Sequence, residues 1–103
     1  MNVIELAIRI YGANAQIDVA VEEMAELTQA LIKTKRYAED KDFDRFRANL
    51  VEEIADVEIM LAQMRIIYAV DEKEIEDVKT FKLKRLADRL KELIQSTKEE
   101  DGT

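Results

Sequence analysis

The sequence predicts an all-α fold, and three observations carry that prediction. The 103 residues include no proline and only two glycines, so the residues that usually end helices and mark turns between strands are almost absent. Apolar residues recur every three or four positions over long stretches, which is the spacing of one helix face. Charged residues make up 38% and apolar residues 48%, a balance typical of amphipathic helices rather than of a disordered chain.

The first two helices are expected on either side of Gly12. A short apolar segment covers residues 2–11, and Gly12 suits the helix C-cap because glycine readily adopts the conformation that ends a helix. The second helix is predicted over residues 14–36. Its apolar face consists of Ile17, Ala20, Met24, Leu27 and Leu31.

The third helix is predicted over residues 43–70, after a polar, aperiodic turn at 37–42, with Asp42 or Asp44 as its N-cap. One of its apolar faces consists of Phe43, Phe46, Leu50, Ile54, Val57, Leu61 and Met64. Much of the opposite side is apolar too, with Ala48, Ala55, Ile59, Ala62 and Ile66. A helix that is apolar on two sides is expected to be buried on two sides, so this helix should form the centre of the protomer and also contact another subunit.

The fourth helix is predicted over residues 72–96, and the acidic residues of its first turn suit the helix dipole. Its expected buried stripe consists of Ile75, Val78, Leu86, Leu90 and Leu93. Residues 97–103 are expected to be a frayed tail. The whole chain is thus predicted to be one domain, a four-helix bundle-like protomer with antiparallel central helices. A chain this short buries only a modest core, so we expect it to self-associate.

Composition excludes several classes of function. The net charge of −7 argues against binding to a nucleic-acid backbone, which needs clustered Lys and Arg. The absence of cysteine excludes disulfides and thiolate sites, and the absence of histidine excludes Ser–His–Asp triads and His-ligated zinc or di-iron sites. No apolar run approaches the roughly 18 residues of a membrane span. The first residues lack a signal-peptide pattern, so a cytoplasmic location is expected.

Four carboxylates occupy positions where an ordinary surface residue is not expected. At about 100° per residue, Glu53 falls inside the main apolar arc of the third helix and Asp56 falls at its edge. Glu23 and Glu26 lie one turn apart beside the apolar stripe of the second helix. Burying a carboxylate is costly unless it is paired or bound to a metal ion. These positions therefore favour a metal site.

The spacing of these carboxylates also favours a common site. If the two central helices form an antiparallel hairpin centred in the turn, Glu23 lies level with Asp56 and Glu26 lies level with Glu53. Four carboxylates at one level repel each other unless cations neutralise them, and all-oxygen ligation suits Mg²⁺, or Mn²⁺ as an alternative. The competing interpretation is a solvated acidic face, which we expect for Glu22, Glu52 and Glu58.

Basic residues on the fourth helix could complement this site. Lys82 and Arg89 fall within its apolar arc, and Lys79 and Arg85 flank it. Basic groups that face inward beside a carboxylate–metal cluster are suited to binding a polyphosphate. Alternatively, their stems lie along the edge of the core and their charges pair with Glu or Asp.

With these residues in view, the sequence resembles the MazG-like all-α NTP pyrophosphohydrolases. The family pattern is EExxE followed by ExxD, which here reads Glu22-Glu23-Met24-Ala25-Glu26 and Glu53-Ile54-Ala55-Asp56. The lysine-bearing stretch Lys79-Thr80-Phe81-Lys82-Leu83-Lys84-Arg85 is also similar to the family. The likeness extends over residues 16–89. It departs from many relatives at Leu86, where they carry Asn.

The resemblance implies an activity and a set of roles. The family cleaves nucleoside triphosphates, including deoxynucleoside triphosphates, between the α and β phosphates, giving the monophosphate and pyrophosphate. Its metal ligands correspond to Glu23, Glu26, Glu53 and Asp56. Glu22, which opens the motif, corresponds either to a residue that supports the ligands or to an accessory base. Family members form dimers or tetramers, which implies a homo-oligomer here.

From the residues and the resemblance together, we expect a Mg²⁺-dependent NTP pyrophosphohydrolase. Glu22 or Glu26 would accept the proton of the attacking water. Lys79, Lys82, Arg85 and Arg89 would bind the phosphates. Two alternatives remain open at this point. One is a helical oligomerisation or interaction module without activity, and the other is a regulator that binds nucleotides but does not hydrolyse them.

Overall fold

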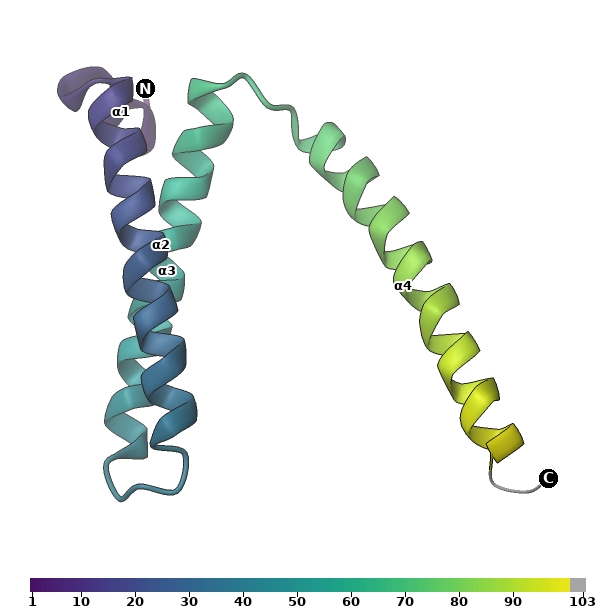
Figure 1. The fold of residues 1–103 in the computed structure, drawn as a ribbon. Helices are drawn as coiled ribbons and strands as arrows, with labels where there is room; N and C mark the ends of the chain where they lie inside the picture. Colours follow the sequence, from purple (N-terminus) through teal and green to yellow (C-terminus); the bar gives the residue numbers. More distant parts are fainter. Residues whose placement is uncertain (101–103) are drawn as a thin grey trace. The chain divides into compact units, whose positions relative to one another are not determined.

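The structure, a computed structural model, describes residues 1–100, and these residues are almost entirely helical (Figure 1). The helices are α1 (Val3–Tyr11), α2 (Ala13–Arg36), α3 (Phe43–Ile67) and α4 (Glu72–Glu100). No strand occurs in the described part of the chain, so the predicted all-α class is confirmed. The chain divides into two compact units, Met1–Ala69 and a second that begins at Val70, and each is described by itself.

α1 is held at both ends by local hydrogen bonds. Its N-cap is Asn2, whose side-chain Oδ1 accepts a hydrogen bond from the backbone N–H of Glu5 at 2.9 Å. Gly12 has a φ of 90° and donates its N–H to the carbonyl of Ile8, which confirms it as the C-cap. Because glycine tolerates this positive φ, the chain can change direction and begin α2 at the next residue.

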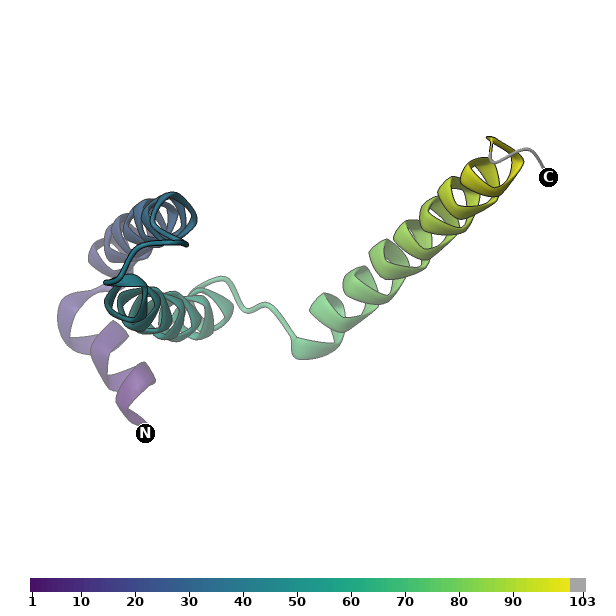
Figure 2. The ribbon, with the colours of Figure 1, turned by 90° about the horizontal axis from the view of Figure 1, so that it is seen from below.

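α2 and α3 form an antiparallel hairpin (Figures 1 and 2). They are joined by a short turn over residues 37–42, as the sequence predicts. α1 packs against both helices at the end of the hairpin that is remote from this turn (Figure 1). Beside the turn, the rings of Tyr37 and Phe46 stack with their centroids 4.7 Å apart, and the Arg45 guanidinium lies 5.2 Å from the Phe46 centroid.

The α2–α3 interface is narrow and contains few large apolar side chains. Its buried residues are Gln16, Ala20 and Ala30 on α2, and Val57, Met60 and Gln63 on α3. The alanines allow the two backbones to approach closely. Glu23 lies on the same face of α2, between Ala20 and Ala30, and Glu53 lies one turn from Val57 on α3. Both glutamates therefore occupy positions at which a helix pair usually places apolar side chains.

Two helix boundaries differ from the prediction by more than one residue, the ends of α3 and α4. α3 ends at Ile67 rather than at residue 70, and Ala69 then adopts a positive φ of 52°. α4 continues past Ser96 to Glu100, so the predicted frayed tail is wrong for residues 97–100. Thr97 supports this extension, because its hydroxyl donates to the carbonyl of Leu93 at 2.9 Å. The rest of the predicted tail, residues 101–103, lies outside the described residues.

Two apolar faces that the sequence predicts to be buried are exposed within this chain. No residue of α4 between Glu72 and Glu100 is buried. In its predicted apolar stripe Ile75 is partly covered, and the exposed members are Val78, Leu86, Leu90 and Leu93. On the second face of α3, Ile59 is 49% exposed and Ile66 is 45% exposed. The predicted contact of the second α3 face with another subunit, and the predicted burial of the α4 stripe against other helices, stay predictions. None of the helices in residues 1–100 has the length and apolar content of a membrane-spanning segment.

Candidate metal centre

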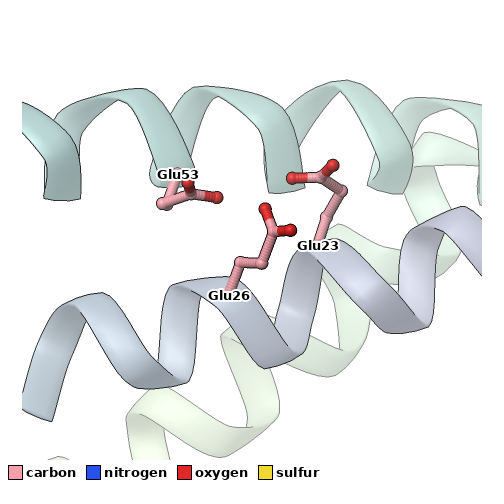
Figure 3. A group of neighbouring side chains, drawn as sticks. All are labelled: Glu23, Glu26 and Glu53. Atoms are coloured by element: carbon pink, nitrogen blue, oxygen red, sulfur yellow. The ribbon is translucent and has the colours of Figure 1, made fainter.

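Three glutamates from two helices meet across the middle of the α2–α3 interface (Figure 3). Glu23 and Glu26 extend from adjacent turns of α2, and Glu53 extends from α3 towards them. One carboxylate oxygen from each residue lies within 4.8 Å of the oxygens of the other two. We refer to Glu23, Glu26 and Glu53 as the carboxylate cluster. Three of the four carboxylates that the sequence predicts to meet at one level therefore lie close together, and Asp56 is not among these three.

Asp56 lies outside the group of three but acts on it electrostatically. Its charge helps to raise the pKa of both Glu23 and Glu53, and a protonated Glu23 can donate a hydrogen bond to it. In the same way, the charge of Glu26 raises the pKa of Glu53, and a protonated Glu53 can donate a hydrogen bond to Glu26. The predicted pairs, Glu23 with Asp56 and Glu26 with Glu53, therefore correspond to interactions across the hairpin.

The cluster contains carboxylate oxygens that are buried without a hydrogen-bond donor. Glu23 Oε2 and Glu53 Oε2 are shielded from solvent, and neither accepts a hydrogen bond from any described residue. Ion pairs in the described chain link Arg45 with Asp42, Lys73 with Asp77 and Lys84 with Asp88, so none of them neutralises the cluster. An unpaired buried charge is unfavourable, and a bound cation would compensate it.

The pKa of both half-buried glutamates is raised above the ordinary value of 4.5. For Glu23 the largest cause is desolvation, followed by the charges of Glu26, Asp56 and Glu53. For Glu53 it is again desolvation, followed by the charges of Glu26 and Asp56. Desolvation and like charges both disfavour the ionised carboxylate. A cation bound at the cluster would favour the ionised carboxylates and so lower the pKa of both Glu23 and Glu53.

The residues fit a hard divalent cation. All the side chains that converge here offer carboxylate oxygens, which are the ligands of Mg²⁺ and Mn²⁺, and neither histidine nor cysteine occurs in the chain to favour a softer metal. The buried oxygens of Glu23 and Glu53 have no hydrogen-bond donor, so a positive charge at this place would stabilise them. Glu26 and Asp56 are more exposed and lie at the rim of the site.

The other predicted site residues lie elsewhere on the helices. Glu22 is exposed on α2, next to Glu23. Lys79, Lys82, Arg85 and Arg89 lie on α4, in the second unit, so their approach to the carboxylate cluster stays a prediction. Within that unit, Lys79 and Lys82 help to line a surface depression of about 330 Å³ with Val70 and Val78. The Arg85 guanidinium lies 5.9 Å from the centroid of the Phe81 ring.

One polar pair near the site was not predicted from the sequence. Gln16 Nε2 on α2 donates a hydrogen bond of 2.7 Å to Gln63 Oε1 on α3, and both side chains are buried. The available signal was position, because Gln16 and Glu23 share one face of α2 and Gln63 and Asp56 are equally spaced on α3. Glutamine is common on exposed helix faces, so its identity alone gave no warning.

The site is therefore described by its own side chains: three clustered glutamates, a neighbouring aspartate and a polar pair farther along the same interface. Comparison of the chain with protein-family models, with curated proteins and with solved structures returns no match.

Proposed function

We propose that this protein is a Mg²⁺-dependent hydrolase that cleaves nucleoside triphosphates between the α and β phosphates. The observation that carries the proposal is the carboxylate cluster, whose oxygens lie within 4.8 Å of one another and include two buried oxygens without a hydrogen-bond donor. A helix pair selected only for packing would not retain such a group at its centre. The EExxE and ExxD motifs, which resemble those of the MazG-like family, contribute these same residues.

In this proposal Glu23, Glu26, Glu53 and Asp56 hold Mg²⁺, with Mn²⁺ as an alternative. When bound there, the ion would supply polarisation of the phosphate and a lowered pKa for a coordinated water. Glu23 and Glu53, each with a buried oxygen in the α2–α3 interface, would position the ion and with it the triphosphate. The more exposed positions of Glu26 and Asp56 leave the rim of the cluster open to a ligand.

The remaining roles concern the proton and the phosphates. Glu22 or Glu26 accepts the proton of the attacking water, because both are exposed carboxylates within one turn of Glu23. The basic side chains of α4 bind the phosphate oxygens. Lys79, Lys82 and Arg89 form no ion pair within the described chain, so their charges remain for a ligand, and Arg85 lies over an aromatic ring beside them. The proposed enzyme acts in the cytoplasm as a homo-oligomer.

The test is pyrophosphate release from each NTP and dNTP in the presence of Mg²⁺. We expect turnover by the wild type and a loss on the order of 100-fold or more in Glu53→Gln, because losing a metal ligand costs at least as much as losing one of its outer partners. Glu52→Gln is the matched control, since Glu52 is an exposed neighbour outside the cluster. Absence of pyrophosphate with every nucleotide would overturn the proposal.

The same assay tests the role of α4. We expect Lys82→Ala to raise the KM for the triphosphate by about tenfold, the value of one charge-assisted contact of about 1.4 kcal/mol. Lys84→Ala removes the same charge from the same helix, but Lys84 is already paired with Asp88 at 3.2 Å. It should change the KM by less than about twofold. Equal effects in the two variants would contradict a specific phosphate-binding role for Lys82.

One observation favours a second candidate, a helical interaction module without catalysis. Large apolar side chains are exposed on α1, on the second face of α3 and on α4, including Ile10, Ile59 and Leu93. Metal titration separates the candidates. A module without a metal site should show no Mg²⁺-dependent rise in melting temperature, whereas an enzyme or a nucleotide-binding regulator should show one.

A further inference from the structure

The buried Gln16–Gln63 hydrogen bond joins the two helices that carry the carboxylate cluster. The donor Nε2 and the acceptor Oε1 are 2.7 Å apart, and the residues are only 7% and 4% exposed. They are the buried polar residues of the described chain, since its other buried residues are apolar. A buried amide pair contributes little net stability compared with an apolar pair of similar volume, so its presence calls for another explanation.

We propose that Gln16 and Gln63 are positioning residues, which fix the register of α2 against α3 and thereby set the spacing of the carboxylate cluster. This inference rests on the proposed function, because it assigns the pair a role in metal binding. The hydrogen bond can form only when the two amides lie level. A single buried polar contact of this kind is known to select one register in a helix pair, whereas apolar contacts tolerate several.

The positions of the two glutamines support a common register. Gln16 lies about two turns from Glu23 on the same face of α2, and Gln63 lies about two turns from Asp56 on α3. Because the helices are antiparallel, the alignment that pairs the glutamines also brings Glu23 level with Asp56. A slip of one turn, about 5.4 Å, would separate both pairs together.

The charges of the cluster make such a constraint necessary. Glu23, Glu26, Glu53 and Asp56 repel one another across the interface, which tends to push the helices apart at this level. Towards the turn, the helices are held by the connection itself and by the stacked rings of Tyr37 and Phe46. At the opposite end α1 packs against both helices, and the Gln16–Gln63 hydrogen bond is the side-chain hydrogen bond that joins α2 directly to α3 there.

The test uses the double variant Gln16→Leu/Gln63→Leu, which removes both amides and leaves no buried group without a partner. The chain contains no native cysteine, so spin labels can be attached at Asp18→Cys and Glu58→Cys, exposed positions on α2 and α3. We expect the double variant to melt no lower than the wild type. We expect its inter-label distances, measured without metal, to broaden or to shift by about 5 Å. In unlabelled protein, its affinity for Mn²⁺ should fall by about tenfold, because the ligands no longer share one arrangement.

Met60→Leu is the matched control, because it changes a buried apolar side chain nearer to the cluster without removing a polar contact. It should leave both the distances and the Mn²⁺ affinity unchanged. A double variant with wild-type distances, or with wild-type Mn²⁺ affinity, overturns the positioning role. If the wild type itself binds no Mn²⁺, the proposed function fails, while the distances still decide whether the glutamines fix the register.

Discussion

At the scale of single residues, Glu23 and Glu53 are the carboxylates whose pKa the fold raises. Each has a buried oxygen without a hydrogen-bond donor, and each has a pKa raised by desolvation and by neighbouring carboxylates. Since the unfolded chain exposes both groups to water, their ionisation opposes folding whenever no cation is bound. Stability should therefore depend on pH in a way that these two residues control.

Without divalent cations, we expect the melting temperature to fall as the pH rises from 4.5 through the raised pKa values of Glu23 and Glu53. Well below 4.5 the folded and unfolded states both carry these protons, so the stability no longer changes with pH through these groups and is at its highest. Above 4.5 the folded state holds more protons than the unfolded state, so stability falls until both groups are ionised. Thermal melts in EDTA across this range measure the slope.

Glu23→Gln should reduce this slope and raise the melting temperature at neutral pH in EDTA, because it removes one of the buried charges. Glu22→Gln is the control, since it neutralises an exposed carboxylate on the same helix. Addition of Mg²⁺ should raise the melting temperature of the wild type more than that of Glu23→Gln. Identical pH slopes in the wild type and Glu23→Gln would contradict the origin of the effect.

The carboxylate cluster could be predicted from the sequence, whereas the glutamine pair could not. The helical repeat and the centre of the turn together fix which residues lie level, and the acidic residues at those positions stand out against an apolar face. Gln16 and Gln63 satisfy the same geometry. They were missed because a glutamine on an amphipathic helix is ordinarily exposed, and only the three-dimensional contact distinguishes a buried one.

At the scale of the helices, the end of α3 shows why boundaries are harder to predict than helices. The apolar repeat continues to Val70, but the helix ends at Ile67 and Ala69 takes a φ of 52°. This conformation normally attracts glycine, and the sequence offers none here. The termination signal was therefore absent from the sequence. α4 was predicted to end too early, at Ser96, because the apolar repeat stops there. The polar residues that follow are nevertheless acceptable in a helix, and α4 continues to Glu100.

Ala69→Gly should stabilise the protein by about 0.5–1 kcal/mol, because glycine adopts a positive φ without the strain that a Cβ atom introduces. Ala48→Gly, at an exposed position inside α3, should destabilise it by about 1 kcal/mol. Urea denaturation of both variants in EDTA provides the comparison. A loss of stability in Ala69→Gly would show that this residue does not hold the conformation described.

At the scale of the whole molecule, the exposed apolar faces lead us to expect that the protein associates with other chains. The buried apolar residues of the described chain are Ala20, Ala30, Val57 and Met60, and no large side chain is fully buried. Helices with so little covered apolar surface are usually stabilised by association with other chains. The burial of α3 on two sides and of the α4 stripe was predicted from periodicity, which shows that a face is apolar but not which surface covers it.

Ile59→Lys should weaken self-association, because it places a charge on the exposed apolar face of α3. We expect the apparent mass in sedimentation to fall towards the 11.9 kDa of a single chain. Gln29→Lys introduces the same charge at an exposed polar position on α2 and should leave the mass unchanged. A wild type that already sediments as a monomer would exclude the predicted homo-oligomer.

The glutamates at the α2–α3 interface also define a conflict between folding and activity. Leucine at positions 23 and 53 would extend the apolar contacts of Ala20, Ala30 and Val57 along the hairpin, and would remove the repulsion between the helices. Directed evolution for heat resistance alone should therefore converge on apolar residues at these two positions. The variants it yields would be the most robust forms of the hairpin and, on the proposed mechanism, inert towards nucleotides.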